Sequence, residues 1–169
     1  MTNSSSQIDR SEHQLKLKPF RSLVVEDDFS CRILLQGLLS KYGQCDAAST
    51  GREGVKAFRA SLSSGNPYQL ITMDIQMPGL DGREALTQIR AIERHHSIEA
   101  AGVKILMTTT LHDTKTVFSA FGAKCDEYLV KPVHGRNLAE QLAILGLLVH
   151  EDPPMNQLAS ETALGSKGH

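Results

Sequence analysis

The sequence has no tryptophan and few other aromatic residues, and aromatics make up 5% of its 169 residues. A surface that stacks the bases of single-stranded nucleic acid needs several aromatic side chains, so this class of partner is not expected. The formal net charge is only −1, which gives no broad attraction to DNA or to an anionic membrane. The composition therefore predicts that neither nucleic acid nor membrane is a partner.

Cysteines and long apolar runs are also scarce. Cys31, Cys45 and Cys125 lie far apart and form no Cys-x-x-Cys pair, so neither a disulfide framework nor a zinc site is predicted. No apolar run approaches the roughly 20 residues that span a bilayer. The polar N-terminus lacks the apolar core of a signal peptide, and the expected location is cytoplasmic.

One domain is expected between two polar ends. Residues 1–19 are rich in serine, glutamine and charge, and residues 150–169 have a similar composition. Such segments are typical of a flexible arm and a flexible tail. Residues 20–149 are enough for one domain with a sizeable core.

Within this domain, short apolar runs alternate with segments of helical periodicity. The expected strands are 22–25, 44–48, 70–73, 103–108 and 127–130, and the expected helices are 30–39, 51–62, 81–92, 114–121 and 137–148. This alternation predicts an α/β fold, a doubly wound five-stranded parallel sheet in a three-layer α/β/α sandwich. In such a sheet a ligand site is expected beyond the carboxyl ends of the strands.

Polar residues follow the predicted strands at that edge. Glu26 and Asp27 follow the first strand, Asp74 the third, Thr109 the fourth and Lys131 the fifth. Converging carboxylates repel one another unless a cation compensates, and hard oxygen ligands suit Mg²⁺ or Mn²⁺. A hydroxyl and an ammonium can hold phosphoryl oxygens. The set predicts phosphoryl transfer to a carboxylate nucleophile.

A specific pattern is carried by four segments, which are Leu23–Asp28, Met73–Gly82, Met107–Thr109 and Asp126–Pro132. In these segments the sequence resembles the receiver domain family of response regulators, over about residues 20–149. The Asp-x-x-Met-Pro-x-x-Asp-Gly run that starts at Asp74 is the most specific of them. The resemblance implies a flavodoxin-like strand order, 2-1-3-4-5.

The resemblance also implies a role for each site residue. Asp74 corresponds to the phosphorylated aspartate, Asp27 to the direct metal ligand and Glu26 to an acid that reaches the metal through water. The backbone carbonyl of Gln76 would supply a further metal oxygen, and Lys131 would bind the phosphoryl group.

Three further positions match the switch of the family. Thr109 corresponds to the switch hydroxyl and Tyr128 to the aromatic rotamer switch, while Pro132 is expected to follow Lys131 through a cis peptide bond. Tyr128 has the alternative of being an edge packing residue. Thr108 is expected to point into the sheet, because alternate strand residues face opposite sides.

Other acids and some departures have their own interpretation. Asp28 is interpreted as a solvated neighbour or helix cap in preference to a third ligand, and Asp81 as a helix cap. Thr110 stands where the family usually has a small residue, which suggests altered autodephosphorylation. Lys124 replaces a frequent glycine, so a turn there is expected to differ. The stretch 94–102, with its His95-His96 pair, is interpreted as a surface insertion.

The expected function is that of a single-domain, chemotaxis-regulator-like response regulator, because no effector pattern follows residue 150. A histidine kinase or histidine phosphotransfer protein would phosphorylate Asp74, and Phe29, Ile33 and Leu34 are candidates for contact with it, some of them expected in the core. A downstream protein target would bind the face built from 114–121, 127–130 and 137–148.

Two alternatives stay open at this point. One is a phosphorelay intermediate that passes phosphate to a histidine phosphotransferase, and the other is a non-phosphorylated scaffold, or pseudo-receiver. An enzyme is not expected beyond self-catalysed phosphoryl transfer and slow autodephosphorylation. A phosphatase of similar architecture is disfavoured, because Gln76 lies where a second catalytic acid is needed.

Overall fold

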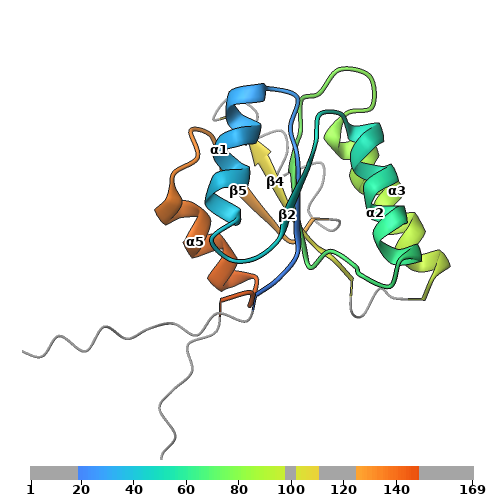
Figure 1. The fold of residues 1–169 in the computed structure, drawn as a ribbon. Helices are drawn as coiled ribbons and strands as arrows, with labels where there is room; N and C mark the ends of the chain where they lie inside the picture. The colour runs from blue at the N-terminus through green and yellow to red at the C-terminus, as the bar shows by residue number, and fades with distance from the viewer. Residues whose placement is uncertain (1–18, 98–101, 111–124, 149–169) are drawn as a thin grey trace, which may run out of the picture. The chain divides into compact units, whose positions relative to one another are not determined.

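The computed structural model describes residues 19–97, 102–110 and 125–148 of the chain (Figure 1). Strands and helices alternate in the order β1 (Ser22–Val25), α1 (Phe29–Leu39), β2 (Cys45–Ala48), α2 (Gly51–Ser63), β3 (Leu70–Asp74), α3 (Gly82–His95), β4 (Lys104–Thr109), β5 (Glu127–Val130) and α5 (Gly135–Ile144). Within these ranges no helix has the length and apolar character needed to cross a bilayer.

The five strands form one parallel sheet in the order β2-β1-β3-β4-β5. This arrangement confirms the predicted fold class and strand order. The register aligns the carboxyl ends of the strands, with Val25 opposite both Ala48 and Met73, and Asp74 opposite Thr108. Residues that directly follow these strands are therefore neighbours in space.

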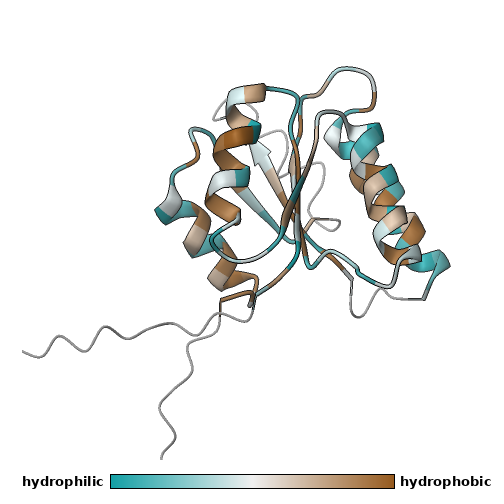
Figure 2. Ribbon diagram, viewed as in Figure 1, coloured by the Kyte–Doolittle hydropathy of each residue, from teal (hydrophilic) through white to brown (hydrophobic). Residues whose placement is uncertain are grey.

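Helices cover both faces of the sheet, with α1 and α5 on one side and α2 and α3 on the other (Figure 1). Alternate residues of each strand enter opposite cores: Ile71 and Met73 pack with Phe58 of α2 and Leu86 of α3, while Leu70 joins the core beneath α1 and α5. The central strands β1 and β3 are buried at every residue and are mainly apolar, as expected where helices cover both faces of a sheet. In Figure 2, brown apolar residues alternate with teal polar ones along the covering helices.

Polar side chains mark where three of the helices begin. The carboxylate of Asp28 accepts a hydrogen bond from the backbone N–H of Cys31, and the Thr50 hydroxyl accepts one from that of Glu53. Asp81 starts α3 with a full capping box, in which Glu84 bonds back to the cap. Such caps satisfy N–H groups that the first turn of a helix leaves free. The cap interpretations of Asp28 and Asp81 are confirmed.

Two predicted helix ends were wrong. The last helix ends at Ile144 and not at residue 148, because Gly146 adopts a left-handed conformation with φ of 72° and turns the chain. The third helix continues past residue 92 to His95, so part of the expected surface insertion is a last helical turn. The predicted helix 114–121, Lys124 and most of the two polar ends lie outside the described residues.

A buried ion cluster ties the end of α3 to the sheet. Glu93 is 1% exposed, and its carboxylate accepts hydrogen bonds from the backbone N–H of Val103 and from Arg90, both at 2.7 Å. Arg90 also donates to Asp126 at 2.7 Å, which lies directly before β5. Each buried charge thus has an opposite charge or a backbone donor beside it.

Candidate functional site

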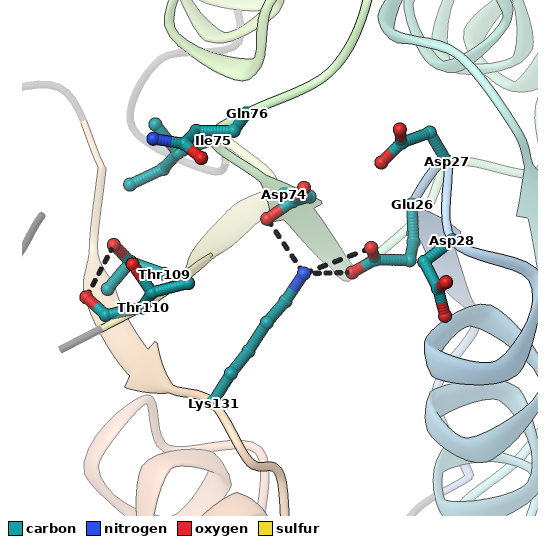
Figure 3. Close-up of a pocket in the computed structure, with 9 residues that line it drawn as sticks. All are labelled: Glu26, Asp27, Asp28, Asp74, Ile75, Gln76, Thr109, Thr110 and Lys131. Atoms are coloured by element: carbon teal, nitrogen blue, oxygen red, sulfur yellow. Dashed lines mark hydrogen bonds and ion pairs between the residues drawn. The ribbon is translucent and has the colours of Figure 1, made fainter. Parts of the chain in front are cut away.

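A small pocket of about 130 Å³ lies at the carboxyl edge of the sheet. Its walls come from the ends of β1, β3, β4 and β5, and Figure 3 shows their side chains converging. The lining residues are Glu26, Asp27, Asp28, Asp74, Ile75, Gln76, Thr109, Thr110 and Lys131. The structure therefore brings together most of the polar residues that the sequence predicted for this edge.

Asp74 and Lys131 are in direct contact at the centre of the pocket. Asp74 ends β3 and is 6% exposed. The Nζ atom of Lys131 lies 2.9 Å from its Oδ1 atom and 2.9 Å from Oε2 of Glu26, which is 1% exposed (Figure 3). One ammonium therefore forms ion pairs with two buried carboxylates, one directly after β1 and one at the end of β3.

Burial and charge pull the pKa values of these groups in opposite directions. Burial raises the pKa of Glu26 and of Asp74 above the usual range, although the hydrogen bond and the charge of Lys131 oppose the rise. For Lys131, burial alone would lower the pKa, but the hydrogen bonds to Glu26 and Asp74 raise it. The lysine is therefore held in its charged form.

The acids form a set that fits a divalent cation. One carboxylate oxygen from each of Glu26, Asp27 and Asp74 lies within 4.8 Å of the others. Glu26 and Asp74 are buried, whereas Asp27 is exposed at the mouth of the pocket. Clustered carboxylate oxygens are the donors that Mg²⁺ and Mn²⁺ prefer, so the residues present fit such an ion.

The threonines at the end of β4 differ in direction. Thr109 lines the pocket, and its hydroxyl donates a hydrogen bond to the carbonyl of Thr110 at 3.3 Å. Thr110 is exposed at the pocket edge. Thr108 is 1% exposed and does not line the pocket. The alternation of a strand thus places Thr109, and not Thr108, beside the acids.

Tyr128, in β5, and Pro132, directly after Lys131, do not line the pocket. Tyr128 is half-buried and packs against the core on the α2–α3 side of the sheet, near Cys125. Burial, together with a hydrogen bond to Cys125, raises its pKa. The peptide bond between Lys131 and Pro132 is cis.

Two residues of the site were missed at the level of sequence. Arg32, in the first turns of α1, donates to the backbone carbonyl of Glu26 at 2.7 Å and to that of Asp27 at 3.1 Å. A Cβ atom on Gly82 would overlap the backbone carbonyl of Asp74. Arg32 has no motif around it, whereas the glycine that follows the Asp81 cap was a signal for a close backbone approach.

The sequence model of a protein family, the response regulator receiver domain, matches residues 22–143 of the chain. The chain belongs to this family. The chemotaxis protein CheY of Treponema pallidum is 32% identical to this receiver domain over 127 residues, which cover 74% of this chain and 81% of the relative. Regulatory protein VanRB of Enterococcus faecalis is 32% identical over 123 residues, which cover 73% of this chain.

The chain spans 50% of the length of VanRB and 15% of that of the sensor protein GacS of Pseudomonas syringae. Receiver domains therefore occur in proteins of quite different length among these relatives.

Solved receiver domains share the fold. The receiver domain of Ssk1 of Saccharomyces cerevisiae, crystallised with the histidine phosphotransfer protein Ypd1, has a TM-score of 0.63 and 28% identity. The alignment covers 75% of this chain and 88% of that chain. The receiver domain of the histidine kinase CKI1 of Arabidopsis thaliana, complexed with Mg²⁺ and BeF₃⁻, has a TM-score of 0.61, 25% identity and coverage of 75% and 89%.

Proposed function

We propose that this receiver domain accepts a phosphoryl group on Asp74 from a phosphorylated histidine of a kinase or phosphotransfer protein. The observation that carries the proposal is the pairing of Lys131 with Asp74 at 2.9 Å beside the Glu26–Asp27 acids. In the reaction the N–P bond of the donor breaks and an O–P bond to Asp74 forms. A carboxylate is an established nucleophile for this chemistry.

The roles of the other side chains follow from where their charges lie. Glu26, Asp27, Asp74 and the backbone carbonyl of Gln76 would hold Mg²⁺ or Mn²⁺, which neutralises charge on the transferred group when bound. Lys131 would shift its ammonium from the free carboxylate to a phosphoryl oxygen, a short movement within the same pocket. The hydroxyl of Thr109 would break its hydrogen bond with the carbonyl of Thr110 and donate to the phosphoryl group instead.

A labelling experiment tests the acceptor. The purified chain is incubated with Mg²⁺ and acetyl phosphate, and the phosphorylated fraction is measured by mobility shift and by intact mass. Asp74→Asn should abolish the label. Asp28→Asn is the matched control, because Asp28 lines the same pocket but caps α1, and asparagine caps a helix equally well. Persistent labelling of Asp74→Asn would refute the assignment.

The first helix offers a surface for the histidine partner. Phe29, Ile33 and Leu34 are 68%, 51% and 47% exposed, so the expectation that some of them belong to the core was wrong. Exposed apolar side chains that gather on one helix mark an interaction surface. The Ssk1 receiver domain, which shares this fold, was crystallised with a histidine phosphotransfer protein, and we place the equivalent partner here on α1.

This surface has its own test. Ile33→Ser should slow transfer from a phosphorylated histidine phosphotransfer protein by about tenfold, since one buried apolar contact is worth about 1.4 kcal/mol or more. Ile144→Ser is the control, because Ile144 is also an exposed isoleucine but lies on α5. Labelling by acetyl phosphate, which needs no docking, should be unchanged in both variants. Equal slowing in the two variants would contradict the placement.

Output and relay roles differ in where the phosphoryl group goes. We infer a switching role, in which phosphorylated Asp74 changes how the face around Tyr128, β5 and α5 binds a downstream protein. A relay intermediate would instead return its label to an added phosphotransfer protein within the assay. A scaffold that is never phosphorylated would show no label at all, although the intact set of Asp74, Thr109 and Lys131 argues against this alternative.

A further inference from the structure

A groove along α2 and α3 is separate from the Asp74 pocket. The two helices pack on the same face of the sheet (Figure 1). Two hollows, of about 510 Å³ and about 170 Å³, lie along their surfaces and share Arg59 and Gln88 as walls. Because two walls are common, the hollows form one continuous surface, which we call the α2–α3 groove.

Cationic side chains line this groove from α2, and two histidines lie at the end of α3. Arg52, Lys56 and Arg59 of α2 are exposed and follow one another at spacings of four and three residues, which place them on one helix face. His95 and His96 line the other end of the groove, where α3 is hydrophilic in Figure 2. Among the described residues, no carboxylate lines either hollow.

The acids of the same two helices are engaged elsewhere. Glu53 accepts hydrogen bonds from the backbone N–H and the hydroxyl of Ser49, both at 2.8 Å. Glu84 bonds back to the backbone N–H of Asp81, and Glu93 is buried with Arg90. The three cations of α2 have no ion pair among the described residues. The positive charge of the groove is therefore uncompensated.

The groove is apolar between its cations. Ile92 and Val55 are mostly buried, at 9% and 7% exposure, yet both contribute to the lining, and Ala91 is exposed beside them. A ligand that fills the groove must therefore present apolar groups to these side chains and negative groups to the cations around them.

We propose that the α2–α3 groove binds an acidic, amphipathic segment of a partner protein. Carboxylates would pair with Arg52, Lys56 and Arg59, and apolar side chains of the segment would cover Val55 and Ile92. A nucleic acid fits the groove less well, because its backbone supplies charge without apolar side chains, and no Phe, Tyr or Trp among the described lining residues offers a stacking platform. Binding here uses no atom of the Asp74 pocket, so the unphosphorylated chain should bind the segment.

The test uses a fluorescently labelled helical peptide in which leucine and glutamate follow a helical period, titrated with the full chain by anisotropy. The double variant Lys56→Glu with Arg59→Glu should bind it about tenfold more weakly or worse, and added salt should weaken binding to the wild type. The isosteric change Gln88→Glu adds one negative charge to the shared wall and should weaken binding by about threefold. Circular dichroism confirms that each variant is folded.

The matched control is Lys41→Glu with Arg136→Glu, which makes the same two exchanges at exposed positions outside the groove. This control and Asp74→Asn should bind the peptide like the wild type, so a failure of the phosphorylation proposal leaves this result unaffected. Equal weakening in the groove and control variants would overturn the proposal. Tighter binding of a single-stranded oligonucleotide than of the peptide would also overturn it, in favour of nucleic acid.

Discussion

The ammonium of Lys131 lies 2.9 Å from Oδ1 of Asp74, and it occupies the position of a counter-ion among acids that also fit a divalent cation. A divalent cation bound to these acids would therefore compete with the lysine for the same negative charge. We expect Lys131→Met to bind Mn²⁺ more tightly, by about tenfold, since one nearby charge is worth about 1.4 kcal/mol or more in a half-buried site.

Electron paramagnetic resonance of free Mn²⁺ measures this affinity directly. Lys41→Met is the control, because Lys41 is an exposed lysine that does not line the pocket. Although it binds metal better, Lys131→Met should be phosphorylated more slowly, because the phosphoryl oxygens lose their cation. Weaker metal binding in Lys131→Met would show that the lysine orders the acids more than it repels the ion.

Thr110 lies at the exposed edge of the pocket on the β4 side. It is exposed, it lines the pocket, and its carbonyl accepts the hydrogen bond of Thr109. Removing its side chain in Thr110→Ala should let water reach the phosphorylated aspartate more easily, which shortens the half-life of the label. The half-life after removal of the donor is the measurement, and an unchanged value would rule out a gating role for this side chain.

Substitution of glycine by alanine should have opposite effects on stability at Gly82 and at Gly37. A Cβ atom on Gly82 would overlap the Asp74 carbonyl, so Gly82→Ala should destabilise the fold by about 2 kcal/mol and disturb the acceptor. Gly37 is exposed in the last turn of α1, and a methyl group added there would have no atom within 4 Å, so Gly37→Ala should stabilise the fold by about 0.5–1 kcal/mol. Urea unfolding of both variants checks the signs.

The hydroxyl of Thr72 is buried in β3 without a hydrogen-bond partner among the described residues. A hydroxyl in this position costs free energy, and a methyl group of the same shape does not. Thr72→Val should therefore raise the free energy of unfolding by about 1 kcal/mol. Thr50→Val removes the cap of α2 and should lower the free energy of unfolding by about 1 kcal/mol. Thermal and urea unfolding of both variants measures these changes. A change in the opposite direction in either variant would contradict its prediction.

Tyr68 links stability to alkaline pH. Burial and the 2.7 Å hydrogen bond that it donates to Asp46 raise the pKa of Tyr68 to about 12. A phenol with a higher pKa in the folded state stabilises the fold fully below its unfolded value of about pH 10, and this contribution is lost as pH rises from there toward 12.

Tyr68→Phe should therefore flatten the loss of stability in this alkaline range, measured as the free energy of unfolding in urea at a series of pH values. Absorbance of the phenolate reports the ionisation independently. Asp46→Asn should move the ionisation of Tyr68 to lower pH, because the charge that opposes the phenolate is removed. A stability curve of Tyr68→Phe with the slope of the wild type would contradict the assignment.

Much of the sheet and of the pocket could be predicted from the sequence, because both depend on local signals. The strands β1, β3 and β4 contain short apolar runs, and Asp28 and Asp81 stand where a helix needs an acceptor. The carboxyl ends of parallel strands share one edge of the sheet. The sequence could therefore predict that Asp74 and Lys131 lie near each other, although it does not show how side chains pack.

The parts that could not be predicted depend on three-dimensional packing. Helix α1 has apolar residues on several sides, so periodicity alone did not show that Leu35 and Leu39 are buried while Ile33 and Leu34 face outward. The end of α5 was missed because leucines continue past the turn at Gly146. Arg32 was missed because its partners are backbone carbonyls, which carry no sequence signature.

Arg32 fastens the acidic loop to the helix that follows it. Its guanidinium donates to the carbonyls of Glu26 and Asp27 and lies 5.5 Å from the centre of the Phe29 ring. We therefore expect a displacement of the loop backbone at Glu26 and Asp27 to move the first turns of α1, with the exposed ring of Phe29, as well. A protein bound at Phe29 would then respond to whether the neighbouring carboxylates are free or neutralised, without contacting them.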